Sequence, residues 1–373
     1  MLSTIPFTAK EHFVLGSFTS NCSSGMTITT VPERWDSSWE NNLALARLLD
    51  EADIDFMLPV ARWVGNGGAT NFHGNVLETI TWAAGLLAQT ENLHVFATVH
   101  TAMSHPIVVA KQLATIDHIS DSRIGLNIVA GWNKPEYEAF GLELPDDHET
   151  RYAYAQEWFD VIGKLWTHDG RFDWDGEFFH LKNVHGDPKP QRPLPIVNAA
   201  GSQVGREFAV RNADFLFTSA LDLSRSRDEN AQLKEQAAAA GRDVDVLTFS
   251  HVICRPTEKE AQDWLQYTAR DNVDRVALDN TVNLQVANAQ SFPHDLLLQL
   301  RDSFAIGHGG FQLIGTPEQV ADGITALHEV GFGGTTLSFV DYVEEFPYFR
   351  DNVLPILEER GIRQPVAAAA ATG

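Results

Sequence analysis

Short apolar or β-branched runs bounded by turn residues recur along this chain, and most are followed by a segment with the periodicity of an amphipathic helix. About eight such runs are predicted to be strands, at residues 12–18, 55–60, 93–100, 124–130, 195–200, 214–218, 247–254 and 334–340. Eight parallel strands, each followed by a helix, are what a closed (β/α)8 barrel requires. Because no change of composition divides the chain, the pattern predicts one α/β barrel of the TIM type, with a doubly wound open sheet as the alternative.

Helical patterns lie between the strands, at 35–52, 106–119, 151–166 and 317–330. The first begins at a cap signal formed by Asp36 and Ser37. In the last, Thr316 is expected to be the N-cap, Pro317 the first helical residue and Gln319 the capping-box partner.

Two segments depart from this alternation. Residues 172–181 predict an inserted β-hairpin that turns at Asp175-Gly176. The stretch 257–311 is too long for one helix, contains a second helical region near 295–304, and is a candidate lid over the barrel mouth. The expected plan is therefore a single barrel domain over 1–365 and a disordered tail at 366–373.

The charge balance limits the class of partner. The chain has 373 residues and a formal net charge of −23, and no basic stripe is evident, which argues against nucleic acid or an anionic membrane as a partner. No apolar run is long enough for a membrane helix, and the N-terminus lacks the pattern of a secretion signal. Cys22 and Cys254 are far apart and are expected to be free thiols, so we expect a cytoplasmic protein.

Motifs of several enzyme classes are missing from the sequence. No GxSxG elbow is present, because Ser202 has Ala200 where the first glycine is required. There is no HExxH motif and no cluster with metal-ligand spacing, so no metal is expected. The glycine-rich loop 65–74 has no clean GxGxxG and is only a weak dinucleotide signal.

Neutral polar side chains stand at or near the ends of two successive predicted strands. Thr98 lies near the end of 93–100, and Asn127 lies inside 124–130. A hydroxyl and an amide are not the groups of a hydrolase. They suit a site that binds a flat cofactor and a small neutral molecule through hydrogen bonds.

Two predicted helices begin with groups that favour an anion. Arg151 and Tyr152 lie at the start of one, and Gly201 and Ser202 lie at the start of another. Helix N-termini carry free backbone N–H groups and a partial positive charge, so this rim is expected to bind a phosphate.

Three segments carry a resemblance to a known family. They are QLATIDHISDSRIGLNIVAGWNKPEYEAFG, DDHETRYAYAQEWFDVIGKLW and FQLIGTPEQVA. From about Phe13 to Leu357 the chain resembles the bacterial luciferase-like, flavin-dependent monooxygenases of the two-component type. Within that family it is most similar to the pyrimidine and dimethylsulfone monooxygenase branches.

The resemblance implies a luciferase-like TIM barrel that binds reduced FMN (FMNH2), reacts with O2, and receives FMNH2 from a separate NAD(P)H:flavin reductase. It also implies a homodimer or homotetramer. Thr98 and Asn127 are expected to form the O2 pocket, with Leu58 as its apolar wall. The implied FMN-binding positions are Ala61, Arg62, Asn127, Glu136, Arg151, Tyr152, Gly201 and Ser202.

The implied reaction is insertion of one oxygen atom into a small organic substrate, an N-heterocycle or an organosulfur compound. Candidates to line the substrate pocket are Trp63, His100 and Trp132. The loops 19–31 and 281–308 match neither branch well and are expected to face the substrate. Oxygen transfer from flavin C4a or from N5 is compatible with the pattern, and the Thr98–Asn127 pair favours N5. The alternatives are an F420-dependent hydride-transfer oxidoreductase and a non-catalytic flavin-binding barrel.

Overall fold

Eight parallel strands close into a barrel in the computed structural model, which describes residues 12–288 and 304–364. They pair in the order β1-β2-β3-β4-β7-β8-β9-β11, and β11 pairs with β1. The strands are β1 (Val14–Phe18), β2 (Phe56–Leu58), β3 (His94–His100), β4 (Ile124–Val129), β7 (Ile196–Ala199), β8 (Phe215–Phe217), β9 (Asp245–Cys254) and β11 (Gly334–Ser338). The predicted (β/α)8 barrel is confirmed, and closure of the sheet excludes the doubly wound alternative.

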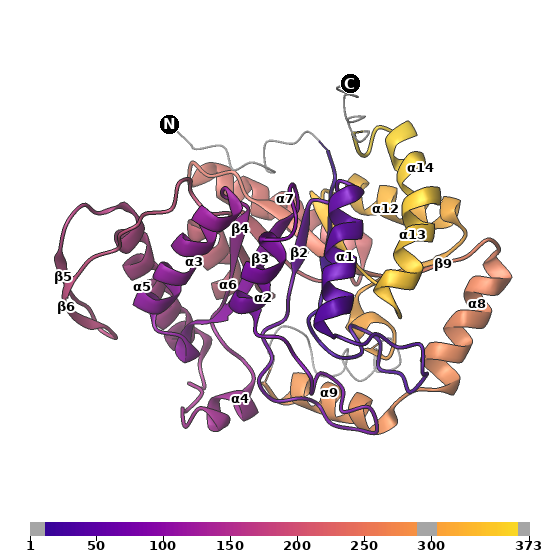
Figure 1. Ribbon diagram of the computed structural model, residues 1–373, viewed down its shortest axis with the longest axis horizontal. Coiled ribbons are helices and arrows are strands. Elements are labelled where there is room, and N and C mark those ends of the chain that lie inside the picture. The colour runs from indigo at the N-terminus through magenta and orange to yellow at the C-terminus, as the bar shows by residue number, and fades with distance from the viewer. Residues whose placement is uncertain (1–11, 289–303, 365–373) are drawn as a thin grey trace.

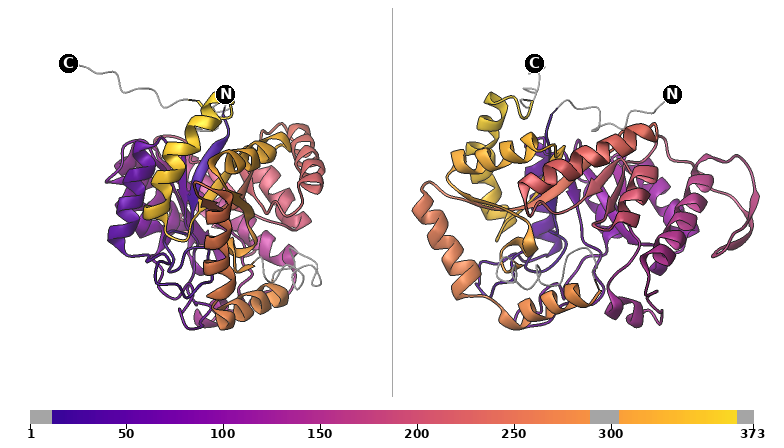
Figure 2. Two further views of the ribbon diagram at one scale, coloured as in Figure 1. Left: turned by 90° about the vertical axis from the view of Figure 1, so that its right-hand side faces the viewer. Right: turned by 180° about the vertical axis from the view of Figure 1, so that it is seen from behind.

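Helices surround these strands (Figure 1 and Figure 2). They are α1 (Trp39–Glu51), α2 (Thr79–Leu87), α3 (Pro106–Ser120), α4 (Lys134–Ala139), α5 (His148–Thr167), α6 (Gln203–Asn212), α7 (Leu223–Ala239), α8 (Glu258–Gln266), α9 (Arg275–Asn288), α12 (Pro317–Glu329), α13 (Tyr342–Asn352) and α14 (Leu354–Glu359). The capping box predicted for Thr316 and Gln319 is present at α12. The cap predicted at Asp36 or Ser37 was wrong, because the side chain of Ser38 accepts the hydrogen bond from Asn41 N at α1.

One strand of the sheet was not predicted. β10 (Phe311–Gly315) pairs with residues 250–254 of β9, whereas β8 pairs with residues 245–247. β11 occupies the other edge of β9, so β10 continues the edge that β8 leaves. β9 has ten residues and β8 has three, so the upper half of β9 requires a second partner on that edge.

The inserted hairpin is present, as predicted. β5 (Phe172–Asp175) and β6 (His180–Val184) pair in antiparallel fashion, and β6 ends three residues beyond the predicted boundary. The hairpin projects sideways from the barrel (Figure 1).

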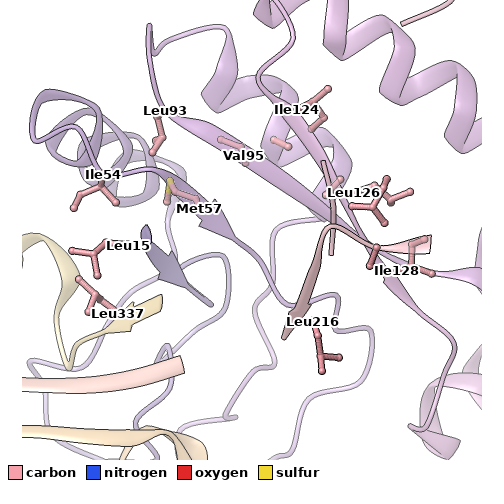
Figure 3. Packing of buried hydrophobic residues seen from close by; sticks show 14 of the residues in the cluster. Leu15, Ile54, Met57, Leu93, Val95, Ile124, Leu126, Ile128, Leu216 and Leu337 are labelled. Carbon is pink, nitrogen blue, oxygen red and sulfur yellow. The ribbon is translucent and has the colours of Figure 1, made fainter. Parts of the chain in front are cut away.

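Side chains of the barrel strands alternate between two apolar layers. Leu15, Val95 and Leu126 belong to the layer between strands and helices, part of which Figure 3 shows. The barrel interior holds a second cluster that includes Phe56 and Phe96. A Cβ atom at Gly125 would lie 2.4 Å from the Phe96 ring, so this glycine leaves the ring the space it occupies. Because these side chains fill the lower barrel, a ligand has room only at the carboxyl ends of the strands.

The insertion between β9 and β11 adds helices at that end. α9 and α4 lie at the same end of the molecule in Figure 1. The second helical region predicted near 295–304 and the predicted tail at 366–373 lie outside the described residues, apart from Phe304. Among the described helices, none is both long and apolar enough to cross a membrane.

Candidate active site

A cavity of about 280 Å³ lies at the carboxyl ends of the barrel strands, where TIM barrels carry their active sites. Strand ends, rim loops and the insertion all contribute to its wall. The residues predicted from the sequence that line it are Ala61, Arg62, Thr98, His100, Asn127, Trp132, Arg151, Tyr152, Gly201 and Ser202. The strand ends therefore bring together groups that are up to about 140 residues apart in the chain.

Thr98 and Asn127 face each other across β3 and β4, where they are register partners. Thr98 Oγ1 donates to the Pro59 carbonyl at 2.6 Å and accepts from Asn127 Nδ2 at 3.1 Å. Asn127 Oδ1 is buried and has no partner among the described residues. The threonine proton is thus committed to Pro59, and the unpaired amide oxygen of Asn127 is an acceptor available to a bound molecule.

The beginnings of α5 and α6 form one end of the cavity. Arg151 is 4% exposed, and its guanidinium donates to the backbone carbonyls of Asp147 and Gly131. Ser202 is the N-cap of α6 and accepts from Gly205 N at 3.2 Å. No carboxylate lines the cavity in the described part of the chain, so the charge of Arg151 remains available for an anion. The donors fit a phosphate.

Tyr152 adds a protonated hydroxyl at the same end. Burial raises its pKa to about 12, with a hydrogen bond to the Asn198 side chain as an opposing influence. A Cβ atom at Gly205 would lie 2.5 Å from the Tyr152 hydroxyl oxygen, so the glycine allows α6 to approach this ring closely. At neutral pH the hydroxyl keeps its proton and is a hydrogen-bond donor.

A buried charge pair lies on the other side of the cavity. Arg62 Nη1 is 3.5 Å from Glu136 Oε1, and the guanidinium lies over the Trp132 ring at 5.6 Å from its centroid. Glu136 Oε1 also accepts from Trp63 N at 2.9 Å, and Oε2 is 3.7 Å from His100 Nδ1. Glu136 is fully buried behind these residues and is not part of the cavity wall.

A family model described as luciferase-like monooxygenase matches residues 14–333. The chain belongs to the luciferase-like monooxygenase family. It is 30% identical over 367 residues to pyrimidine monooxygenase RutA of Cronobacter turicensis, which covers 96% of each chain. It is 31% identical over 365 residues to the FMNH2-dependent dimethylsulfone monooxygenase of Pseudomonas putida, which covers 94% of this chain and 97% of that one.

A solved structure supports the fold of this luciferase-like monooxygenase. Riboflavin lyase RcaE, determined with modified FMN and the substrate riboflavin, superposes with a TM-score of 0.82 at 23% identity. The match covers 95% of this chain and 93% of that one. At this identity the likeness shows the shared barrel fold alone.

Three residues singled out from the sequence lie away from the cavity wall in this luciferase-like monooxygenase. Leu58 lies in the interior cluster of the barrel. The Trp63 side chain is 49% exposed and packs edge-on against Phe140, at 5.2 Å between ring centroids. Glu136, the third, contacts Arg62 instead. The sequence gives the position of each residue but not the direction of its side chain.

Several lining residues were not predicted. Phe18, Phe217 and Phe249 contribute aromatic surface, and His148 lies beside Arg151. Others come from the loops and the insertion: Met26, His73, Gln285 and His308. The poor match of loops 19–31 and 281–308 to known branches was the available signal, since these loops supply Met26, Gln285 and His308.

The residues that the structure describes contain no group of three or more His, Cys, Asp or Glu side chains arranged to hold a metal ion. Cys22 and Cys254 are both buried and free.

Proposed function

We propose that this luciferase-like monooxygenase binds FMNH2 in the cavity and uses O2 to insert one oxygen atom into a small organic substrate. The carrying observation is a single cavity with Arg151 free of carboxylate partners at one end and the neutral Thr98–Asn127 pair on its floor. The proposal draws further support from a relative whose printed name is FMNH2-dependent dimethylsulfone monooxygenase.

The cofactor would be held at its phosphate by Arg151, Tyr152, Ser202 and the backbone N–H groups at the start of α6. An anion at this point meets a guanidinium, a protonated phenol and a helix N-terminus together. Gly201 belongs to the same loop and leaves the backbone accessible.

Asn127 and Thr98 would then face the ring system. Their hydrogen bond fixes the amide plane, which leaves Oδ1 oriented as an acceptor. Neither group is ionisable near neutral pH, so the pair offers hydrogen bonds without proton loss to solvent. When bound, the reduced flavin supplies the two electrons that O2 activation needs. The residues around it position the reactants and exclude water.

The reduced flavin would be supplied by a second protein, as the resemblance to two-component monooxygenases implies. We propose a NAD(P)H:flavin reductase as the partner. Ala61 and Arg62 also line the cavity and are proposed to contact the flavin edge.

The test is O2 consumption by the purified protein with FMN, NADH and a flavin reductase, in the presence of uracil, dimethylsulfone or small alkanesulfonates. Products made under 18O2 are analysed by mass spectrometry. One labelled atom in a product supports the proposal. Hydride transfer with F420 in the absence of O2 would favour the F420-dependent oxidoreductase instead. Flavin binding without turnover of any substrate would favour the non-catalytic flavin-binding barrel.

A further inference from the structure

Two arginine side chains, Arg62 and Arg151, line the cavity, and each lies near a different group of titratable residues. Arg151 lies among Tyr137, Tyr152 and His148, whose pKa values are shifted by burial first and by this guanidinium second or third. Arg62 acts in the same way on a separate group of three histidines, His73, His100 and His308. Arg151, Tyr152 and His148 line the proposed phosphate end. We call the part of the cavity that His73, His100 and His308 line the lid half.

Among the described residues, the charges of the lid half nearly cancel. Arg62 has Glu136 at 3.5 Å, and the side chains are 6% and 0% exposed, so the buried carboxylate offsets the guanidinium. Burial lowers the pKa of His73 well below its usual value, and burial with the nearby Arg62 holds the pKa of His308 at about 4. Both imidazoles are therefore neutral at pH 7.

His73 and His308 also have polar atoms without partners. His73 Nε2 lies 2.6 Å from the Gly25 carbonyl, which can only accept, so Nε2 carries the proton and Nδ1 is an unpaired lone pair. His308 Nδ1 is buried and has no partner among the described residues. A buried unpaired N–H is costlier than an unpaired lone pair, which favours the proton on His308 Nε2.

The two rings are nearly parallel, with 6.3 Å between centroids and 21° between planes. His308 is only partly buried and lines the cavity, and its Nδ1 is buried. We therefore assign the Nε2 edge to the cavity. Met26, Phe18 and Phe249 provide apolar surface in the same cavity. This half thus offers a neutral hydrogen-bond donor beside apolar walls.

We infer that the substrate is an uncharged polar molecule that sits in the lid half and accepts a hydrogen bond from His308 Nε2. An anion entering here would lose its hydration, and the one guanidinium that the described residues place in this half already has Glu136 as its counterion. A cyclic amide or a sulfone has a strong neutral acceptor and loses much less. The inference rests on the proposed function and narrows its substrate class, since it excludes sulfonates and carboxylates.

The test compares matched pairs on protein loaded with oxidised FMN, by calorimetric titration. The pairs are dimethylsulfone with methanesulfonate and uracil with orotate, which differ mainly in charge. We expect at least one neutral member to bind, about tenfold or more tightly than its anionic partner. Equal or tighter binding of the anion, or no binding of either neutral compound at millimolar concentration, would overturn the inference.

Three variants test the contacts. Glu136→Gln keeps an acceptor for Trp63 N and releases the Arg62 charge, so methanesulfonate should bind about tenfold more tightly while dimethylsulfone changes little. His308→Ala should lower the affinity for the neutral ligand by up to about tenfold. His308→Asn, which tolerates the left-handed backbone found there (φ 55°), should recover part of this loss.

An unchanged anion-to-neutral ratio in Glu136→Gln would contradict the charge argument. Unchanged neutral binding in His308→Ala would contradict the hydrogen bond. FMN affinity is measured on every protein. If the wild-type protein does not bind FMN, the proposed function itself is refuted. If it binds FMN but does not prefer the neutral ligand, only the inferred substrate class is refuted.

Discussion

Thr98 and Asn127 obtain their position from strand register rather than from unusual chemistry. Both point into the barrel because side chains alternate along β3 and β4, and Thr98 lies two residues after the interior Phe96. A shift of one residue in either strand would turn its polar group toward the helices. The pair therefore lies directly above the apolar filling of the barrel.

Asn127→Ala should lower product formation by at least about tenfold, with less than about a threefold change in FMN affinity. The substitution removes the unpaired amide oxygen and the bond to Thr98, but leaves the phosphate end intact. Thr98→Ser is the matched control, because it retains the hydroxyl that bonds to Pro59 and Asn127. Turnover of Asn127→Ala equal to wild type would remove the amide from the mechanism.

Arg151→Met should weaken FMN binding by about tenfold or more and leave riboflavin binding nearly unchanged. Riboflavin lacks the phosphate, so the comparison isolates the proposed charge contact. Titration of the flavin absorbance measures both ligands. If FMN and riboflavin weaken equally, Arg151 acts only through its backbone bonds to Gly131 and Asp147.

At the scale of elements, the insertion and the glycine-rich loop form one unit. Asp274 Oδ2 accepts from Thr70 N and Thr70 Oγ1, at 2.8 and 2.9 Å, and Oδ1 accepts from Ala277 N. Asn66 Nδ2 donates to Thr281 Oγ1 at 2.9 Å. These bonds place α9 against loop 65–74, which explains how His73 and Gln285 reach the same cavity.

Asp274→Ala should open this unit locally, because the backbone donor of Thr70 loses its buried acceptor. The expected cost is about 1–3 kcal/mol, seen as faster hydrogen exchange in 65–74 and 275–288. Peroxide release per turnover should rise as water gains access.

Thr316→Ala is the control for this variant. It removes the α12 cap at a cost of about 1 kcal/mol, without contact to α9. Uniformly faster hydrogen exchange throughout the barrel in Asp274→Ala would show that the Asp274–Thr70 hydrogen bonds stabilise the whole fold rather than the unit formed by α9 and loop 65–74.

At the scale of the whole molecule, a partly buried carboxylate links two barrel strands at the end opposite the cavity. Asp214 precedes β8, and its carboxylate accepts from Ile196 N at 2.8 Å and lies 3.7 Å from Arg242. Burial raises the pKa of Asp214 to about 6. This end of a TIM barrel contributes to stability rather than to chemistry.

The raised pKa sets the sign of a pH effect on stability. Between about pH 4 and pH 6 the folded state keeps a proton that the unfolded state has lost, so this contribution declines as pH rises through that range. Asp214→Asn should remove it. The unfolding free energy of wild type minus variant should fall by on the order of 1 kcal/mol from pH 4 to pH 6.5, in urea titrations. A rising or flat difference would contradict the assignment.

Local patterns in the sequence determined the barrel, the predicted helices, the α12 capping box and the β5–β6 hairpin. Each depends on periodicity or on turn and cap chemistry within a few neighbouring residues. The rim positions Arg151 and Ser202 were predictable for the same reason, since Arg151 lies in the first turn of α5 and Ser202 caps α6. β10 was missed because its five residues have no clear alternation and lie beside a glycine-rich segment.

Only the tertiary structure decided which way side chains point and which distant loops meet. It turned Trp63 outward, placed Glu136 behind Arg62 as an internal counterion, and put Leu58 inside the barrel. It also brought His73 beside His308, across most of the chain. These outcomes depend on packing between segments remote in sequence, because burial and charge pairing are set by neighbours in space and not by neighbours in the chain.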